Sequence, residues 1–349
     1  MSASQSQTQA QRQGPGPAPD IPERHAPPRH ALLSRTADNL FWLARLIERA
    51  DFLARIIEAT QRLAALPQAY GGTGTEWESA LVSSGAAEAF HAEAATADEA
   101  SVVEFLAFSP KNPSSIRSCI ELARTNARSV RTALTVEMWD AVNGAWLELK
   151  RFEAALGLSQ PSRSDRLARF LDFVKETSLR FDGSVYRTML RNDAYWFSRL
   201  GLYIERADNT ARILDVKYHV LLPETETIGG SLDYFQWAAI LRAVSALTAY
   251  HWVYRENIRP WLIADLLILR PEMPLSLRAS YNSVVEILDA IAKAYGRQGQ
   301  AQRQARTALA RLANTTIDQV FQTGLHEFIT AFIGDNTRLG LAISEQYLV

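Results

Sequence analysis

Two copies of a Glu-Arg-Ala-Asp tetrapeptide gather charged side chains in this sequence, at residues 48–51 and 205–208. Carboxylates and guanidiniums at this spacing can form ion pairs or bind a charged peptide end, and two carboxylates that converge can transfer protons. In each copy an arginine, Arg55 or Arg212, follows the aspartate by four residues, the favourable acid-before-base order in a helix. The chemistry to consider is therefore that of paired Glu and Arg side chains.

The two tetrapeptides lie within a longer internal repeat. LARLIERADFLARIIEA, from Leu43, aligns without a gap to LGLYIERADNTARILDV, from Leu200, at a constant offset of 157 residues with nine of seventeen positions identical. A repeat of this length indicates duplication. We therefore predict a helical bundle with pseudo-twofold duplicated halves.

Helical geometry separates the apolar from the charged residues of the first copy. At about 100° per residue, Leu43, Leu46, Ile47 and Ala50 share one stripe that faces a core, and Glu48, Asp51 and Arg55 lie opposite. Three interpretations stay open: a solvated charged face, a buried network, and a cleft that holds a polar ligand or peptide. In the buried network the two helices face each other, Glu48 pairs with Arg206, and Glu205 pairs with Arg49. The candidate cleft residues are Glu48, Arg49, Asp51, Arg55, Glu205, Arg206, Asp208 and Arg212.

The elements that must position these side chains are predicted to be helices throughout. Residues 1–30 are rich in Pro, Gln and Ser and are expected to form a disordered tail, and residues 31–349 one helical domain. Apolar residues recur at helical spacing in the domain, with no alternating strand pattern. The fold class is therefore all-α, a multi-helix bundle. The predicted helices include 34–66, one from Asn112, 161–180 with a break at Asp182-Gly183, 188–222, 232–258, and three more between 275 and 347.

Composition argues against several classes of function. The net charge of −1 disfavours a nucleic-acid binder, because phosphate neutralisation needs a basic excess. Cys119 is the single cysteine and the six histidines include no helical metal-ligand pair, so we expect no metal. No glycine-rich phosphate loop is present, so we expect no cofactor. The polar N-terminus and the lack of a long apolar run predict a cytoplasmic protein without a membrane span.

Several long motifs resemble one bacterial family. LSRTADNLFWLARLIERADFLARIIEA from residue 33, NPSSIRSCIELARTNARSVRTALTVEMWDAVN from residue 112, and GSLDYFQWAAILRAVSALTAYHWVYRENIRP from residue 230 are similar to the alpha-E family, a helical domain of unknown function with a Glu-Arg motif. The second copy fits too, so the resemblance covers Leu33 to Val349. Within the block from residue 112, Asn126 and Arg128 form a pattern similar to Asn209 and Arg212 and are added to the candidate cleft. One departure is Leu202, which stands where the family commonly has an arginine, so that a basic role at this position rests on Arg45.

The resemblance implies partners rather than a reaction. Alpha-E proteins are commonly encoded beside, or fused to, an ATP-grasp protein and a transglutaminase-like protease. We therefore expect a non-catalytic accessory, scaffold or peptide-binding protein that works with a peptide ligase and this protease in peptide synthesis or modification. The alternative is a stand-alone enzyme that acts on a peptide-like substrate through Glu48 and Glu205. Adjacent arginines would hold both carboxylates ionised, which disfavours a general acid, and no catalytic residue is assigned.

Overall fold

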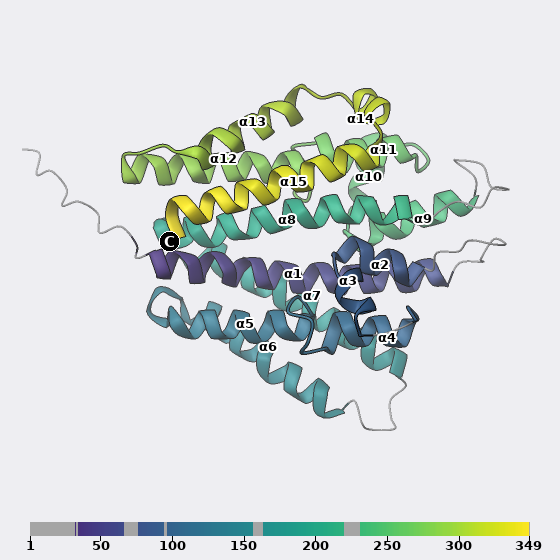
Figure 1. Ribbon diagram of the computed structural model, residues 1–349, viewed down its shortest axis with the longest axis horizontal. Helices are drawn as coiled ribbons and strands as arrows, with labels where there is room; N and C mark the ends of the chain where they lie inside the picture. Colours follow the sequence, from purple (N-terminus) through teal and green to yellow (C-terminus); the bar gives the residue numbers. More distant parts are fainter. Residues whose placement is uncertain are drawn as a thin grey trace, which may run out of the picture. The chain divides into compact units, whose positions relative to one another are not determined.

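Every regular element in the described part of the chain is helical. The computed structural model describes Leu32 and residues 34–65, 76–93, 96–155, 163–219 and 231–348 (Figure 1). These helices belong to one compact unit, Leu32–Val349. The α-helices are α1 (Ser34–Ala64), α2 (Glu76–Ser84), α3 (Ala87–His91), α4 (Glu99–Val103), α5 (Ile116–Ser129), α6 (Val136–Ala155), α7 (Arg163–Thr188), α8 (Asp193–His219), α9 (Ser231–Ala243), α10 (Leu247–Tyr254), α11 (Pro260–Ala264), α12 (Leu277–Tyr295), α13 (Gln300–Asn314), α14 (Ile317–Thr323) and α15 (Leu325–Ile343). Short π- or 3₁₀-helical turns are η1 (Glu104–Phe108), η2 (Arg131–Ala133), η3 (Asp265–Leu269) and η4 (Ser344–Leu348).

Helices α1 and α8 lie side by side and run in the same direction at the centre of this unit (Figure 1). Helix α1 also contacts α2, α5, α7, α9 and η4, and its buried residues lie all around its axis. Gly201 sets the distance between α1 and α8, since a Cβ at this position would lie 2.2 Å from the backbone oxygen of Phe41. The repeated Glu-Arg segments are therefore held backbone against backbone, which brings their charged side chains together.

Capping contacts recur in the two parts of the chain that follow α1 and α8. The Ser115 hydroxyl accepts the backbone N–H of Ser118 at the start of α5 and donates to the Ser109 carbonyl oxygen. Ser276 caps α12 in the same way, with a bond from Ala279 and a bond to the Arg270 carbonyl. A π-helical turn precedes each cap, η1 in one part and η3 in the other. These recurrences support the predicted pseudo-twofold relation between whole halves, which stays a prediction.

Four predictions of helix boundaries or helix number were wrong. The predicted helix 232–258 is divided into α9 and α10, because Ser245 between them has a positive φ of 54° that a helix does not allow. Helix α7 continues through Asp182 and Gly183, because Phe181 and Val185 on either side are buried in the core and outweigh the cost of about 1 kcal/mol for a helical glycine. Helix α8 begins at Asp193 rather than at residue 188. Residues 275–347 form α12, α13, α14 and α15 rather than three helices, since Thr316 caps a separate α14. The predicted tail lies outside the described residues.

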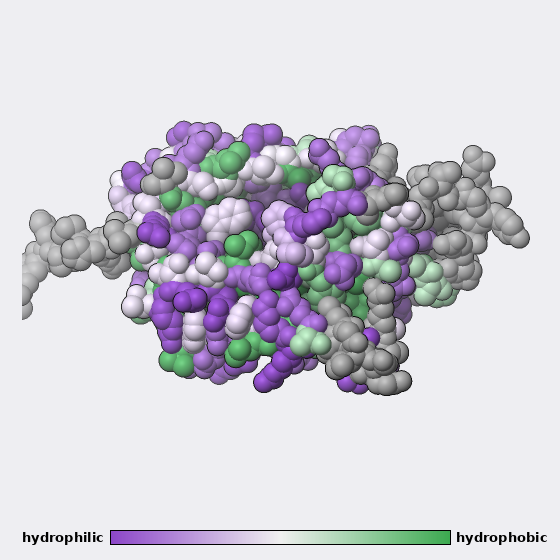
Figure 2. All heavy atoms as spheres, turned by 60° about the horizontal axis from the view of Figure 1, so that its bottom comes forward, coloured by the Kyte–Doolittle hydropathy of each residue, from purple (hydrophilic) through white to green (hydrophobic). Residues whose placement is uncertain are grey.

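The surface carries both polar and apolar residues. On the face shown in Figure 2, hydrophilic residues cover much of the surface and hydrophobic residues lie in separate areas between them. The large apolar side chains instead fill the interior, where Phe41, Phe170, Phe197 and Tyr281 are almost fully buried. Apolar burial of this kind is the main favourable contribution to folding. This apolar packing helps to hold α1 and α8 in place, in addition to their polar contacts.

Candidate functional site

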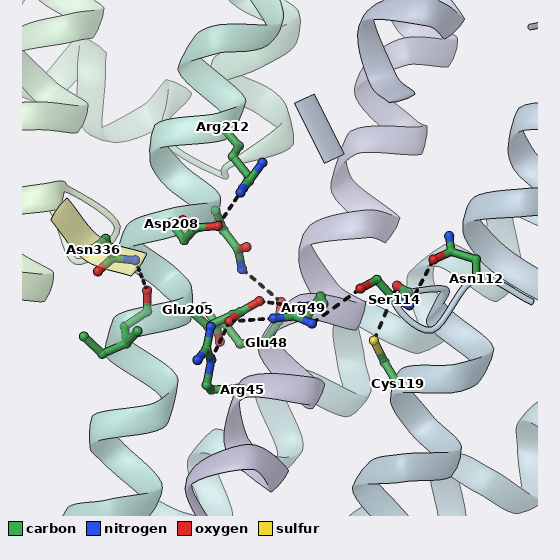
Figure 3. A network of polar contacts seen from close by, with 12 residues as sticks. Arg45, Glu48, Arg49, Asn112, Ser114, Cys119, Glu205, Asp208, Arg212 and Asn336 are labelled. Atoms are coloured by element: carbon green, nitrogen blue, oxygen red, sulfur yellow. Dashed lines mark hydrogen bonds and ion pairs between the residues drawn. The ribbon is translucent and has the colours of Figure 1, made fainter. Parts of the chain in front are cut away.

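Glu48 and Glu205 each form an ion pair with the arginine of the opposite central helix, and Figure 3 shows the Arg49–Glu205 pair. Arg206 donates to both carboxylate oxygens of Glu48, from Nε at 2.7 Å and from Nη2 at 3.2 Å. Arg49 donates to Glu205 in the same two-point geometry, at 2.6 Å and 3.2 Å. The predicted reciprocal pairing is therefore confirmed. The solvated-face interpretation was wrong, since Glu48 and Glu205 are only 6% and 2% exposed.

Further polar groups make the surroundings of the two carboxylates unequal. Glu205 accepts a second arginine, because Arg45 Nε donates to its Oε2 at 2.7 Å. The Arg45 guanidinium also lies 4.6 Å from the ring centre of Trp42, a cation–π contact. The basic role expected of Arg45 therefore has a partner in the structure. Leu202, which aligns with Arg45 in the internal repeat, is buried among apolar residues of α8.

Asp182 joins the network from α7, at the position that sequence reasoning took for a helix break. It forms an ion pair with Arg199, and its Oδ2 lies 3.8 Å from Nη2 of Arg206. Arg206 therefore lies between two acids, Glu48 and Asp182. No signal in the sequence pointed to Asp182, because its two partners lie on another helix.

The remaining pairs of the motif connect the central helices to the ends of neighbouring helices. Arg55 binds Asp51 at 2.6 Å, and Arg212 binds Asp208 at 2.6 Å. Arg55 also donates to the carbonyl oxygen of Ala243, the last residue of α9, at 2.7 Å. Arg212 donates to the Ser83 carbonyl near the end of α2 at 3.3 Å. A cation is favourable at a helix C-terminus, where carbonyl groups lack helical partners.

Burial and charge move the pKa values of these groups in different directions. Burial alone would raise the pKa of Glu205, but Arg49 and Arg45 outweigh it and lower this pKa to about 2. Attraction to Glu205 in turn raises the pKa of Arg49. Burial raises the pKa of Asp51 to about 6, with Glu48 adding to the rise and Arg55 opposing it. Glu205 is therefore an ionised acceptor at neutral pH and cannot serve as a general acid there.

A hollow of about 210 Å³ opens beside the Arg49–Glu205 pair. We call it the α1–α8 hollow. Within it the half-buried Asp208 and Arg212 lie next to Asn209, whose amide donates to the Glu48 backbone carbonyl at 3.3 Å (Figure 3). Its wall therefore carries both acidic and basic groups. The lining residues are Arg49, Phe52, Leu53, Ser84, Gly85, Ser114, Glu205, Asp208, Asn209 and Arg212.

The loop before α5 supplies a hydroxyl group to this hollow. The Asn112 side chain accepts the backbone N–H of Ser114 at 2.9 Å and donates to the Phe105 carbonyl at 3.2 Å, which fixes the turn. The Ser114 hydroxyl accepts a long hydrogen bond from Arg49 Nη1, at 3.4 Å. Sequence reasoning read this segment only as a helix start, because 65 residues separate Ser114 from Arg49.

Cys119 lies beneath this loop as a packed thiol. Its Sγ is buried and lies 3.5 Å from the Ser114 carbonyl oxygen. Burial raises the pKa of this thiol to about 12, so that it stays protonated and unreactive at neutral pH.

Of the ten candidate residues, only Arg49, Glu205, Asp208 and Arg212 line the hollow, and two of the others lie away from the ion pairs as well. Asn126 and Arg128 lie in the last turns of α5, half-buried and exposed respectively. The start of α5 adjoins Ser114, and ten helical residues from there to Asn126 span about 15 Å. Within the described residues neither side chain contacts the ion-pair network. The remaining four candidates, Glu48, Asp51, Arg55 and Arg206, belong to the ion pairs described above but do not line the hollow.

Two kinds of feature are absent from the described residues. None of their His, Cys, Asp and Glu side chains form a group of three or more that could hold a metal ion. No described helix has the length and apolarity needed to cross a membrane.

Comparison with known proteins identifies the family. The pattern of the Alpha-E family, described as a predicted alpha-helical domain with a conserved ER motif, matches residues 32–348. The chain therefore belongs to the Alpha-E family. We call the Glu-Arg segments of α1 and α8 the two ER motifs of this chain. No curated protein and no solved structure matches the chain.

Proposed function

We propose that this chain is a non-catalytic accessory or scaffold protein that binds a charged peptide end in the α1–α8 hollow. In this role it works with an ATP-grasp peptide ligase and a transglutaminase-like protease in the synthesis or modification of a peptide. The observation that carries the proposal is a hollow whose wall presents both guanidinium and carboxylate groups next to the paired ER motifs. The partners rest on the family resemblance alone.

The charges of the hollow complement those of a peptide end. Arg49 and Arg212 can bind a carboxylate, and Asp208 can bind an ammonium group. Asp208 is half-buried, and Arg212 already occupies its Oδ2, which leaves the second carboxylate oxygen for a ligand. The chemistry suits a molecule that carries both signs of charge, as the end of a short peptide does.

The size of the hollow supports a short segment rather than a whole cofactor. Its volume of about 210 Å³ is below the roughly 300–1,000 Å³ of pockets that enclose drug-sized ligands. Gly85 shapes one side of it, because a Cβ at this residue would lie 3.3 Å from Nη1 of Arg212. One or two peptide residues are the ligand that this space suits.

The electrostatics support binding over proton transfer at Glu205. A pKa of about 2 keeps this carboxylate ionised, so its role is to hold Arg45 and Arg49 in place. Arg49, fixed at two points by Glu205, then points one remaining donor toward Ser114 and the hollow. Fixed donors of this kind bind a ligand with little loss of side-chain entropy.

Binding of short peptides with free and blocked ends tests the peptide part of the proposal. We expect a mixture of unmodified dipeptides to bind the full-length protein in ligand-detected NMR, and the same dipeptides with acetylated and amidated ends to bind far more weakly. Equal signals from free and blocked dipeptides would contradict the proposed recognition of charged ends. Absence of binding by every free dipeptide would also contradict it.

Affinity purification from the native host tests the partner part. We expect the tagged full-length protein to recover an ATP-grasp or a transglutaminase-like protein, identified by mass spectrometry. The Arg212→Gln variant provides the comparison, because Arg212 lines the hollow and its loss leaves both reciprocal ion pairs intact. Recovery of neither protein by a folded bait would contradict the accessory role, whatever the outcome with dipeptides.

A further inference from the structure

A second hollow lies on the far side of α8, between α13 and α15. Its volume is about 460 Å³ and its floor includes Tyr281 of α12. We call it the α13–α15 hollow. None of its residues belongs to the ER motifs, so it is separate from the site proposed above. The lining residues are Tyr281, Gln300, Arg303, Gln304, Thr307, Ala308, Arg311, Asp335, Arg338 and Leu339.

The charges of this hollow are unbalanced in favour of arginine. Arg303 and Arg311 extend from one face of α13, and Arg338 from α15. Asp335 is the only acid in the lining, and it forms ion pairs with both Arg311 and Arg338. Arg303 has no ion-pair partner among the residues described. The three guanidiniums and one carboxylate leave an excess of two positive charges around a shared space.

Neutral polar groups add hydrogen-bonding capacity beside the arginines. Gln300 and Thr307 lie on the same face of α13 as Arg303. The buried Oε1 of Gln304 has no hydrogen-bond partner within the described part of the chain. A buried carbonyl oxygen without a partner costs free energy, so this amide gains stability by turning toward a donor on a ligand. A ligand for this hollow would therefore combine an anion with a hydroxyl or amide group.

We propose that the α13–α15 hollow binds a small phosphorylated molecule. A phosphate monoester carries about −1.5 to −2 charges at neutral pH, which matches the excess charge of the lining. Arginine forks fit phosphate oxygens at two points, and three arginines from two helices line this hollow. A volume of about 460 Å³ lies in the range of small-molecule pockets, which leaves room for the part of the ligand that bears the phosphate.

Calorimetric titration of the full-length protein at low salt tests this site. The probes are glycerol phosphate, which offers both an anion and hydroxyl donors, inorganic phosphate, and uncharged glycerol. We expect glycerol phosphate to bind more tightly than inorganic phosphate, and glycerol not to bind. The affinity should fall as ionic strength rises, because the charges are exposed to screening.

Two arginines of α13 provide a matched pair of variants. Arg303→Gln removes a lining guanidinium without breaking an ion pair, and we expect about tenfold weaker binding of glycerol phosphate. Arg306→Gln removes an exposed guanidinium of the same helix that pairs with Asp289 and lies outside the lining, and we expect unchanged affinity.

Three results would overturn the proposal. They are absence of glycerol phosphate binding at millimolar concentration, unchanged affinity in Arg303→Gln, and an equal loss in Arg306→Gln. The last result would show attraction to the general charge of α13 rather than a site. Each is independent of the dipeptide experiment, so failure here leaves the proposed peptide site standing.

Discussion

The two ER motifs use the same residues to build different surroundings. On α8, Glu205 accepts two arginines and borders a hollow with a polar wall that includes Ser114. On α1, Glu48 forms an ion pair with Arg206, and that arginine is shared with a second acid, Asp182. The reciprocal Glu–Arg pairs are therefore a shared framework of this bundle. The two motifs differ in the residues that surround these pairs.

The loops that approach the two ER motifs also differ in polarity. The segment Asn112-Pro113-Ser114-Ser115 brings a hydroxyl to Arg49, whereas Met273-Pro274-Leu275-Ser276 has an apolar residue where Ser114 stands. There the Thr210 hydroxyl donates to the Leu275 carbonyl at 2.7 Å and so satisfies that loop internally. Ser115 and Ser276 cap their helices alike. Of these two loops, the one before α5 is therefore the one that offers a side-chain hydroxyl to an ER-motif residue, Arg49.

The largest effects on stability are expected when the carboxylate of Glu205 or of Glu48 is removed. The two effects should differ in size. Glu205→Gln leaves Arg45 and Arg49 without their anion, and breaking a buried pair costs about 3 kcal/mol or more. We expect the thermal unfolding midpoint to fall by roughly 5–10 °C. Glu48→Gln should lower it less, because Arg206 keeps Asp182. Scanning calorimetry of both variants checks this, and an equal or larger loss in Glu48→Gln would contradict the asymmetry.

Two helical glycines should respond to alanine in opposite ways. In Gly201→Ala the new methyl group meets the Phe41 backbone at 2.2 Å, so α1 and α8 must separate, at a cost of about 2 kcal/mol or more. Gly183→Ala in α7 meets no atom within 4 Å and should stabilise the protein by about 0.5–1 kcal/mol. Denaturant unfolding of the two variants measures both changes. A neutral Gly201→Ala would show that the central helices are not in close contact.

Asp51 and Glu205 should contribute to the pH dependence of stability with opposite signs. The folded-state pKa of Asp51 is raised to about 6, so the folded protein binds this proton more tightly than the unfolded chain does. Stability from Asp51 is therefore present at pH 4 and lost as the pH rises through 6. The pKa of Glu205 is lowered to about 2, so its contribution is present above about pH 4.5 and lost as the pH falls toward 2.

The Asp51→Asn variant isolates the first of these contributions. Its unfolding free energy relative to that of the unmodified protein should rise by about 1–3 kcal/mol between pH 4 and pH 7. Urea unfolding at several pH values gives this difference. A constant difference across the range would show that the Asp51 carboxyl group has an ordinary pKa.

The smallest effects on stability are expected at two neighbouring serines. Ser114→Ala removes the acceptor of one long hydrogen bond and should change the unfolding free energy by less than about 0.5 kcal/mol, while dipeptide affinity falls about fivefold. Ser115→Ala removes the cap of α5 and should cost about 1 kcal/mol of stability with dipeptide affinity unchanged. Calorimetry and NMR titration of both variants separate the two roles. The reverse pattern would place the ligand away from the loop before α5.

The sequence indicated the ion pairs of the site but not the residues that other helices and loops contribute to it. The constant spacing of the two repeats led to the pairing of Glu48 with Arg206 and of Glu205 with Arg49 as one of three open interpretations, because helical periodicity fixes relative directions. It could not place Ser114 or Asp182, which lie on other helices and reach the network through tertiary packing. The boundary errors have the same origin. Gly183 is a weak helix residue that buried neighbours hold in α7. Ser245 lies in the turn between α9 and α10 with a positive φ of 54°, and no glycine or asparagine in that turn indicated it.

Dipeptide binding by Arg212→Gln and Arg55→Gln tests most directly the claim that the Arg49–Glu205 pair borders a binding site and the Glu48–Arg206 pair is architectural. Both arginines pair with an aspartate four residues earlier and donate to a neighbouring backbone carbonyl, but only Arg212 lines the α1–α8 hollow. With both variants held well below their unfolding midpoints, we expect Arg212→Gln to lose binding of unmodified dipeptides and Arg55→Gln to retain it. Equal binding by the two variants, or loss in Arg55→Gln alone, would contradict the assignment of the hollow as the working site.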